Sequence, residues 1–110
     1  MNDKVIRNGN VAVLYSPGYG AGWSTWAHGN LGNWAVFAPE VVEWVEQGKP
    51  GGTEGLEEIV KSIHGDSCVY CGGGMDLEIE WIPVGTQFKI DEYDGSESVV
   101  RLGEISFYVV

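Results

Sequence analysis

The sequence predicts an α+β fold: a mainly antiparallel β-sheet of about five to six strands, with two short helices packed on one face. Two observations predict it. Apolar residues recur at helical spacing between residues 39 and 65, whereas later segments alternate apolar and polar residues and are separated by turn signals. A chain of 110 residues has the length of one domain, so residues 1–110 are expected to fold as a single domain.

Two segments of the first half are predicted helices. Pro39–Gly48 starts with a proline, which suits the first helical position, and ends with a glycine, which suits a helix stop. The second helix covers residues 53–65, where Thr53 is the expected N-cap and Gly65 the expected stop. Its apolar residues follow the i, i+3, i+4, i+7 pattern of an amphipathic helix, and they are Leu56, Ile59, Val60 and Ile63.

Short β-rich runs predict the strands. The run VAVLY, residues 11–15, is expected to be a buried strand because it is apolar and ends at Ser16-Pro17. Asp94-Gly95 is a strong hairpin signal between two further strands. The remaining predicted strands are SCVYC, LEIEWI, TQFKIDEY, SVVRL and ISFYVV.

The segment SPGYGAGWSTW, Ser16–Trp26, fits no regular helix or strand, because three glycines are interleaved with aromatic residues. The loop is expected to continue to about Trp34, and a long loop in a small domain is often functional. Its G-x-G-x-G spacing matches neither the dinucleotide fingerprint nor the phosphate loop of NTPases. Backbone N–H groups of successive glycines can nonetheless converge on an anion, and aromatic rings can stack on a base or sugar.

We therefore expect a ligand site in this loop, with two basic residues of the second half as phosphate partners. The predicted ligand-binding residues are Ser16, Tyr19, Gly20, Gly22, Trp23, Ser24, Thr25, Trp26, Lys89 and Arg101. The alternative is that the tryptophans fold inward and plug the core, with the glycines allowing the sharp path of the chain. The direction in which Trp23 points separates the two interpretations.

The charge balance is strongly acidic. Sixteen acidic residues against six basic ones give a formal net charge of −10, which repels phosphates and predicts no nucleic-acid partner. No apolar run approaches the length of a membrane span, and the first residues, MNDKVIRNGN, lack the apolar core of a signal peptide. We expect a cytoplasmic protein that uses no cofactor and contacts no membrane.

His64, Cys68 and Cys71 form an H-x3-C-x2-C pattern, with His28 available as a fourth ligand. These residue types suit zinc. In the predicted strand SCVYC, however, the side chains of the two cysteines would point to opposite faces. No metal site is therefore predicted, and zinc on these residues is kept only as an alternative.

The blocks VAVLYSPGYGAGWSTW, FAPEVVEWVEQG and LEIEWIPVGTQFKIDEYDGSES resemble small uncharacterised proteins encoded by bacteriophages and prophages. The likeness covers most of the chain, and the first block is its most distinctive part. No activity is established for that family. The resemblance implies an accessory protein in the cytoplasm of a bacterial host, of a kind that often opposes host defence.

Three functions follow from these observations. The preferred one is a non-enzymatic protein that binds a small nucleotide-like ligand and sequesters a nucleotide signal of host defence, as a homo-oligomer with sites between subunits. The alternative is an acidic protein that inhibits a basic host protein by charge mimicry, using the acids within Glu40–Glu58 or Asp91–Glu97. The second alternative is a small metal-assisted enzyme built on His64, Cys68 and Cys71.

Overall fold

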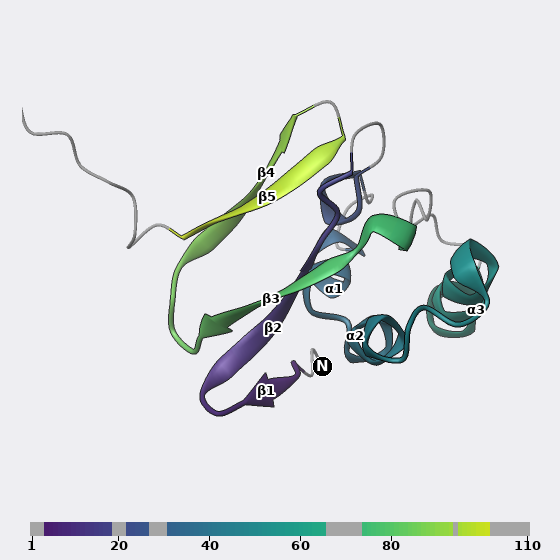
Figure 1. Cartoon of the computed structure of the whole chain (residues 1–110), viewed down its shortest axis with the longest axis horizontal. Helices are drawn as coiled ribbons and strands as arrows, with labels where there is room; N and C mark the ends of the chain where they lie inside the picture. Colours follow the sequence, from purple (N-terminus) through teal and green to yellow (C-terminus); the bar gives the residue numbers. More distant parts are fainter. Residues whose placement is uncertain (1–3, 19–21, 27–30, 66–73, 94, 102–110) are drawn as a thin grey trace, which may run out of the picture.

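The computed structural model describes residues 4–18, 22–26, 31–65, 74–93 and 95–101. Within these ranges the chain forms five antiparallel strands in two sheets and three α-helices (Figure 1). The predicted α+β class is confirmed. The predicted strands SCVYC and ISFYVV fall on residues outside the described ranges.

The larger sheet has the order β1–β2–β3, with β1 at Ile6–Arg7, β2 at Asn10–Tyr15 and β3 at Glu78–Pro83. The central strand β2 contains the predicted VAVLY run, which is confirmed as a largely buried strand. The β1–β2 turn uses Asn8 and Gly9, both with positive φ, a conformation that asparagine and glycine tolerate best.

The smaller sheet is a hairpin of β4, Phe88–Tyr93, and β5, Ser96–Arg101. Tyr93 pairs with Ser96, so the connection has the two residues that the hairpin signal predicted. Gly95 in this connection has φ of 86°. Residues 84–87 connect the two sheets: β1, β2 and β3 form the larger one, and among the described strands β4 and β5 pair only with each other.

Three α-helices follow one another between β2 and β3: α1 at Leu31–Phe37, α2 at Pro39–Glu46 and α3 at Gly52–His64. Both predicted helices are confirmed as α2 and α3, and Pro39 stands in the first turn as expected. The predicted N-cap Thr53 is wrong, because the cap lies two residues earlier, at Gly51, which has the left-handed conformation.

Helix α1 occupies part of the stretch that the sequence analysis assigned to a long loop. Its sequence contains glycine and asparagine, which are poor helix formers. Packing makes up for this weak propensity, because Ala35 is fully buried and Trp34 packs against the core. Two short 3₁₀ turns, Ser24–Trp26 and Gly74–Asp76, flank the helical region in sequence.

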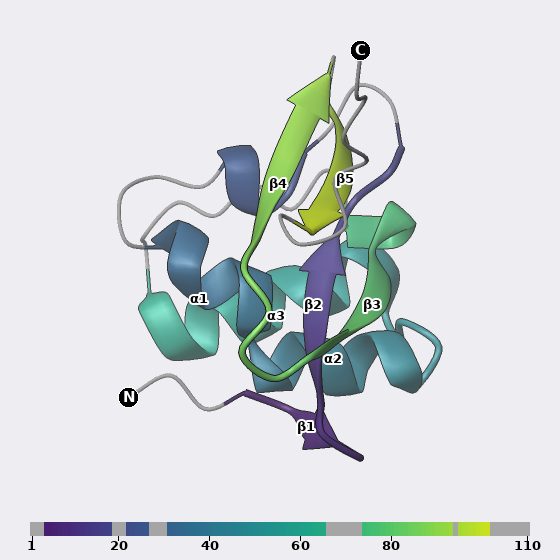
Figure 2. The same cartoon turned by 90° about the vertical axis from the view of Figure 1, so that its left-hand side faces the viewer.

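The elements form three layers (Figures 1 and 2). The helices lie on one face of the β1–β2–β3 sheet, and the β4–β5 hairpin lies over the other. Ala12 and Leu14 of β2 point into the helical layer and form the core with residues of all three helices. The remaining buried members of this core are Trp23, Ala35, Ala38, Val41, Val42, Trp44, Leu56, Val60 and Leu77.

The hairpin and the sheet contact each other through the opposite face of β2 and β3. Val13, between Ala12 and Leu14, points to this face and is fully buried. Arg101 of the hairpin bonds to Glu80 of β3 with 3.2 Å between Nη2 and Oε2. Among the described helices, none is long and apolar enough to cross a membrane.

Candidate functional site

The described part of the Ser16–Trp26 loop folds around the carboxylate of Glu97, which is 1% exposed. The backbone N–H of Ser16 donates to Oε1 at 2.9 Å. The other oxygen, Oε2, accepts from the backbone N–H groups of Trp23 at 2.8 Å and Thr25 at 3.0 Å, and from the Thr25 hydroxyl at 2.6 Å. We call these four donors, with the carboxylate they surround, the Glu97 cradle.

Two further hydrogen bonds, one from the backbone and one from a side chain, join the β4–β5 hairpin to the same loop. The N–H of Glu97 donates to the Ser16 carbonyl at 2.7 Å, and the Ser96 hydroxyl donates to the Pro17 carbonyl at 2.8 Å. The sequence predicted that N–H groups of the loop's glycines converge on an anion, whereas the described donors belong to Ser16, Trp23 and Thr25. The group that these donors surround is a carboxylate of the chain itself, and hydrogen bonding to several donors offsets the cost of burying it.

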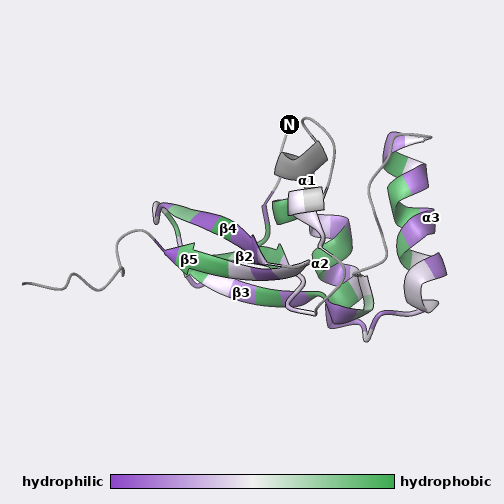
Figure 3. Cartoon of the chain, turned by 90° about the horizontal axis from the view of Figure 1, so that it is seen from above, coloured by the Kyte–Doolittle hydropathy of each residue, from purple (hydrophilic) through white to green (hydrophobic). Residues whose placement is uncertain are grey.

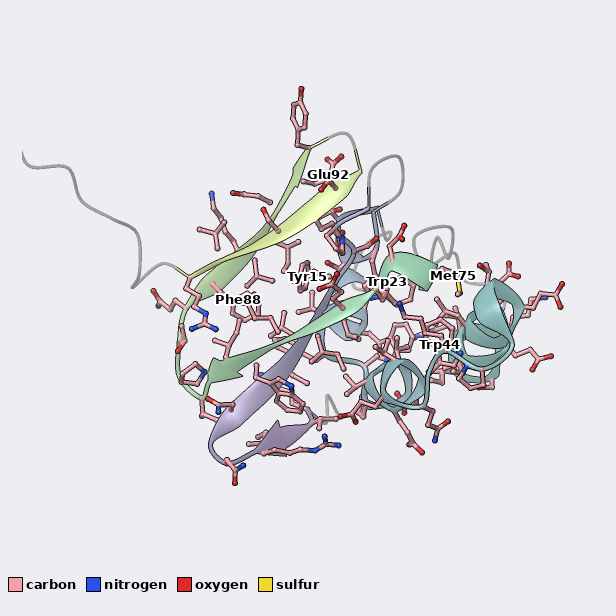
Figure 4. All side chains as sticks on the ribbon, in the orientation of Figure 1. Tyr15, Trp23, Trp44, Met75, Phe88 and Glu92 are labelled. Carbon is pink, nitrogen blue, oxygen red and sulfur yellow. The ribbon has the colours of Figure 1, made fainter. Side chains whose placement is uncertain are left out.

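Trp23 points into the core and is 0% exposed (Figure 4). Its indole N–H donates to the Ala35 carbonyl at 2.8 Å, and its ring lies 6.4 Å from that of Trp34, centroid to centroid. Ser16, Gly22 and Ser24 are also buried, whereas Thr25 is exposed. The orientation of Trp23 agrees with the core-plug interpretation and leaves no face of its ring open for stacking.

The two basic residues predicted to bind the ligand do not meet at the loop. Lys89 and Arg101 lie at the end of the hairpin away from Glu97, opposite Val100 and Phe88. Lys89 pairs with Asp91 at 3.3 Å, and Arg101 also donates to the Trp81 carbonyl. Tyr19 and Gly20 lie outside the described residues, as does the side chain of Trp26, so their part in a site stays a prediction.

A second carboxylate lies against the loop, from the short turn Gly74–Asp76. A Cβ atom on Gly18 would come within 2.2 Å of Asp76 Oδ2, so the loop and this carboxylate approach as closely as only a glycine permits. Two negative charges, on Asp76 and Glu97, thus face the segment that was expected to receive an anionic ligand. This charge arrangement disfavours a phosphate here.

Of the metal-ligand set, only His64 lies among the described residues; His28, Cys68 and Cys71 fall outside them. The His64 ring stands edge-on to Trp34 at 4.4 Å between centroids, and its buried Nε2 has no hydrogen-bond partner in the described part of the chain. No group of three metal-ligating side chains occurs within the described ranges. The metal alternative therefore stays a prediction.

A concave surface lies between α2 and α3, where Figure 4 shows Trp44 between the two helices. The groove has a volume of about 410 Å³, and we call it the acidic groove. Three glutamates and no basic residue line it. Its full lining is Glu40, Glu43, Trp44, Gln47, Pro50, Gly55, Glu58, Ile59, Ser62 and Ile63.

The packing of α2 and α3 explains why these acids face outward. Helix α2 buries Val41, Val42 and Trp44, which leaves Glu40 and Glu43 on its exposed side. The indole N–H of Trp44 donates to the Pro50 carbonyl at 2.9 Å. That carbonyl would lie 2.2 Å from a Cβ on Gly55, so a glycine at this position lets the start of α3 approach the end of α2.

The other acidic segment considered from the sequence, Asp91–Glu97, is more fully engaged by the fold. Glu97 is buried, Asp91 pairs with Lys89, and Glu92 accepts the Gly95 N–H at 2.6 Å. Tyr93, 78% exposed, stands beside these residues at the tip of the hairpin. Among the described residues, none of the three groove glutamates forms an ion pair, whereas Asp91 is ion-paired and Glu97 is buried.

The ion pairs of the described residues lie outside the groove. Arg7 holds Glu46 with two hydrogen bonds, one of them 2.8 Å from Nη2 to Oε1, and this bonding lowers the pKa of Glu46 and raises the pKa of Arg7. On the hairpin side, burial raises the pKa of Tyr15, and Glu78 adds to the rise. Basic residues thus pair with acids elsewhere, while the only charged residues in the described lining of the groove are the three glutamates.

Sequence reasoning missed Glu97 as the partner of the loop and the groove as a shaped site. Nothing in the sequence SESVV distinguishes Glu97 from an acid on an exposed strand. The sequence carried one indication of the groove, the many glutamates within Glu40–Glu58, and the charge-mimicry alternative was based on them. No protein-family model, curated protein or solved structure matches the chain.

Proposed function

We propose that the protein is a non-enzymatic binding protein that attaches to a basic surface of another protein through the acidic groove. The observation that carries this proposal is the lining of the groove, where three carboxylates from two helices gather and, among the described residues, none of them forms an ion pair. Complementary charge steers a basic partner to such a surface and suppresses wrong partners. The resemblance to phage-encoded proteins suggests a host protein as that partner.

The acidic-inhibitor alternative thus replaces the nucleotide binder as the preferred function. The Glu97 cradle uses the N–H donors that an anionic ligand would need, and Trp23 is buried in the core. Lys89 and Arg101 are paired with Asp91 and Glu80. A nucleotide-like ligand stays a prediction that no described residue favours.

The test compares two double variants of equal net charge. Glu43→Gln with Glu58→Gln removes one carboxylate from each wall of the groove, whereas Glu54→Gln with Glu57→Gln removes two exposed carboxylates of α3 outside it. Binding of a labelled arginine-rich peptide is measured by fluorescence anisotropy. Two partly exposed charge contacts correspond to a loss of about tenfold in affinity for the groove variant.

The control variant is expected to lose much less, because its charges act only through the long-range field. Circular dichroism and thermal unfolding check that both variants fold. Equal weakening by the two variants would mean that the peptide senses only the net charge, and the proposed function would then be wrong.

A further inference from the structure

We infer that the acidic groove selects a basic segment that is also amphipathic, with an aliphatic side chain next to its lysines or arginines. This inference rests on the proposed function and names the partner chemistry of the same surface. It adds a second requirement, apolar contact, to the charge requirement stated above.

The apolar part of the groove comes from α3. The sequence pattern places Leu56, Ile59, Val60 and Ile63 on one stripe, which would all face the core in a simple amphipathic helix. In the structure the stripe is divided: Leu56 and Val60 are buried in the core, while the half-buried Ile59 packs against the core and also lines the groove with Ile63. Ile63 is 40% exposed. The hydropathy colouring of Figure 3 shows the alternation of apolar and polar residues along α3.

The carboxylates flank this apolar surface on both sides. Glu40 and Glu43 come from α2, and Glu58 comes from α3. The Gln47 amide donates to Glu43 Oε1 at 3.0 Å, which orients that carboxylate. A lysine or arginine suits such a surface because its aliphatic stem can lie on the isoleucines while its charged end reaches a glutamate.

The groove is shaped before any partner arrives. The Trp44–Pro50 hydrogen bond and the close approach at Gly55 fix the angle between the two helices. A preformed surface needs little reorganisation on binding, which favours affinity. The volume of about 410 Å³ is at the lower end of the range for small-ligand pockets, so it suits a few side chains of a short segment.

Charge decides among the occupants that this shape admits. A second copy of the chain would bring another net charge of −10 to an acidic surface, which opposes self-association. A small polycation would satisfy the glutamates without using the isoleucines. A basic amphipathic segment of a partner protein satisfies both.

The experiment uses the full chain and two synthetic peptides of equal positive charge. One peptide combines lysines with leucines, and the other has serines in place of the leucines. The wild-type protein is expected to bind the leucine peptide about tenfold more tightly, since an apolar side chain leaves water on binding. Ile63→Ser should remove this preference and leave the affinity for the serine peptide unchanged. Val84→Ser, at an exposed apolar residue in the turn after β3, is the matched control and should keep the preference.

Methyl NMR of the isoleucines in the wild-type protein gives a readout that needs no variant. The leucine peptide should shift the methyl signals of Ile59 and Ile63 more than that of Ile6, which is exposed on β1 outside the groove. Sedimentation equilibrium measures self-association in parallel. Spermine serves as the small polycation.

The outcomes separate the two proposals. Equal affinity for both peptides, or spermine binding as tight as the leucine peptide, would overturn the amphipathic requirement while the glutamate double variant still tests the proposed function. Self-association that Ile63→Ser abolishes would also overturn the inference, because the occupant would then be a second copy. If neither the Glu43→Gln, Glu58→Gln double variant nor Ile63→Ser bound the leucine peptide more weakly than the wild type, both proposals would be overturned together.

Discussion

Removal of the Glu97 carboxylate is expected to destabilise the whole fold. Glu97→Ala takes away the acceptor of four hydrogen bonds and leaves the N–H groups of Ser16, Trp23 and Thr25 without it. Each buried donor that loses its acceptor costs about 1–3 kcal/mol, and three backbone N–H groups lose theirs. Small domains have a total free energy of unfolding of about 5–15 kcal/mol, so this single change would use a large share of it.

Glu97→Gln separates the role of shape from the role of charge. Its amide oxygen can take the place of Oε2 and keep the three bonds from Trp23 and Thr25. Its NH₂ group then faces the N–H of Ser16, donor against donor, where the carboxylate had an acceptor. One lost bond to a charged group corresponds to about 1.5–3 kcal/mol, so the stability order should be glutamate, then glutamine, then alanine.

The assay is urea unfolding followed by circular dichroism, with Glu54→Gln as an exposed control of equal charge change. Amide hydrogen exchange at Trp23 and Thr25 should quicken in both Glu97 variants, since the cradle protects these groups. Acetate should stabilise Glu97→Ala more than chloride does, because a carboxylate can refill the cradle. A cost below about 1 kcal/mol for Glu97→Ala would refute this reasoning, because a lost acceptor leaves buried donors unpaired.

Three further predictions concern residues around the cradle. Trp23→Phe loses the indole bond to Ala35 and some core volume, and thermal unfolding should record a loss of about 2–4 kcal/mol. Gly18→Ala forces the Asp76 carboxylate to move, so it should destabilise the wild type and cost less in an Asp76→Gly background, as a double-mutant cycle would show. The raised pKa of Tyr15 means that folding favours its protonated form. This contribution to stability is present below pH 10 and is lost as the pH rises through the folded pKa. Ultraviolet titration of the wild type, compared with Tyr15→Phe, measures the pKa of Tyr15.

Elements with a strong local pattern could be predicted from the sequence. The apolar run of β2, the proline and glycine at the ends of α2 and the two-residue turn of the hairpin each carry their own signal. In these segments, local preference and tertiary packing agree. Helix α1 lacks such a signal, since Ala35 and Trp34 stabilise it through contacts with residues distant in sequence.

The site depended on contacts that periodicity does not record. Glu97 lies 81 residues from Ser16 in sequence, yet its carboxylate completes the hydrogen bonding of the loop. The composition of the loop suggested glycine N–H groups facing an anionic ligand, but it predicted neither the donors Ser16, Trp23 and Thr25 nor their partner Glu97. Likewise, the stripe on α3 predicted one apolar face, but not that Ile63 is exposed and that the half-buried Ile59 also lines the groove between α2 and α3.

The charge of Glu43 is expected to contribute little to folding, because the amide oxygen of a glutamine there can still accept from Gln47. Glu40 and Glu43 are three residues apart on α2, a spacing at which like charges destabilise a helix by about 0.2–0.5 kcal/mol. Glu43→Gln should therefore stabilise the protein slightly while lowering its affinity for the arginine-rich peptide. Glu46→Gln, one turn further along, should instead lose stability because it breaks the pair with Arg7.

Urea unfolding and peptide anisotropy on the same two variants measure both effects. Residues that serve binding are expected to raise the affinity for the partner while lowering the stability of the protein itself. Glu43→Gln could instead lower both the free energy of unfolding and the affinity for the peptide. The carboxylate would then stabilise α2, and its presence on the surface would not indicate a binding partner.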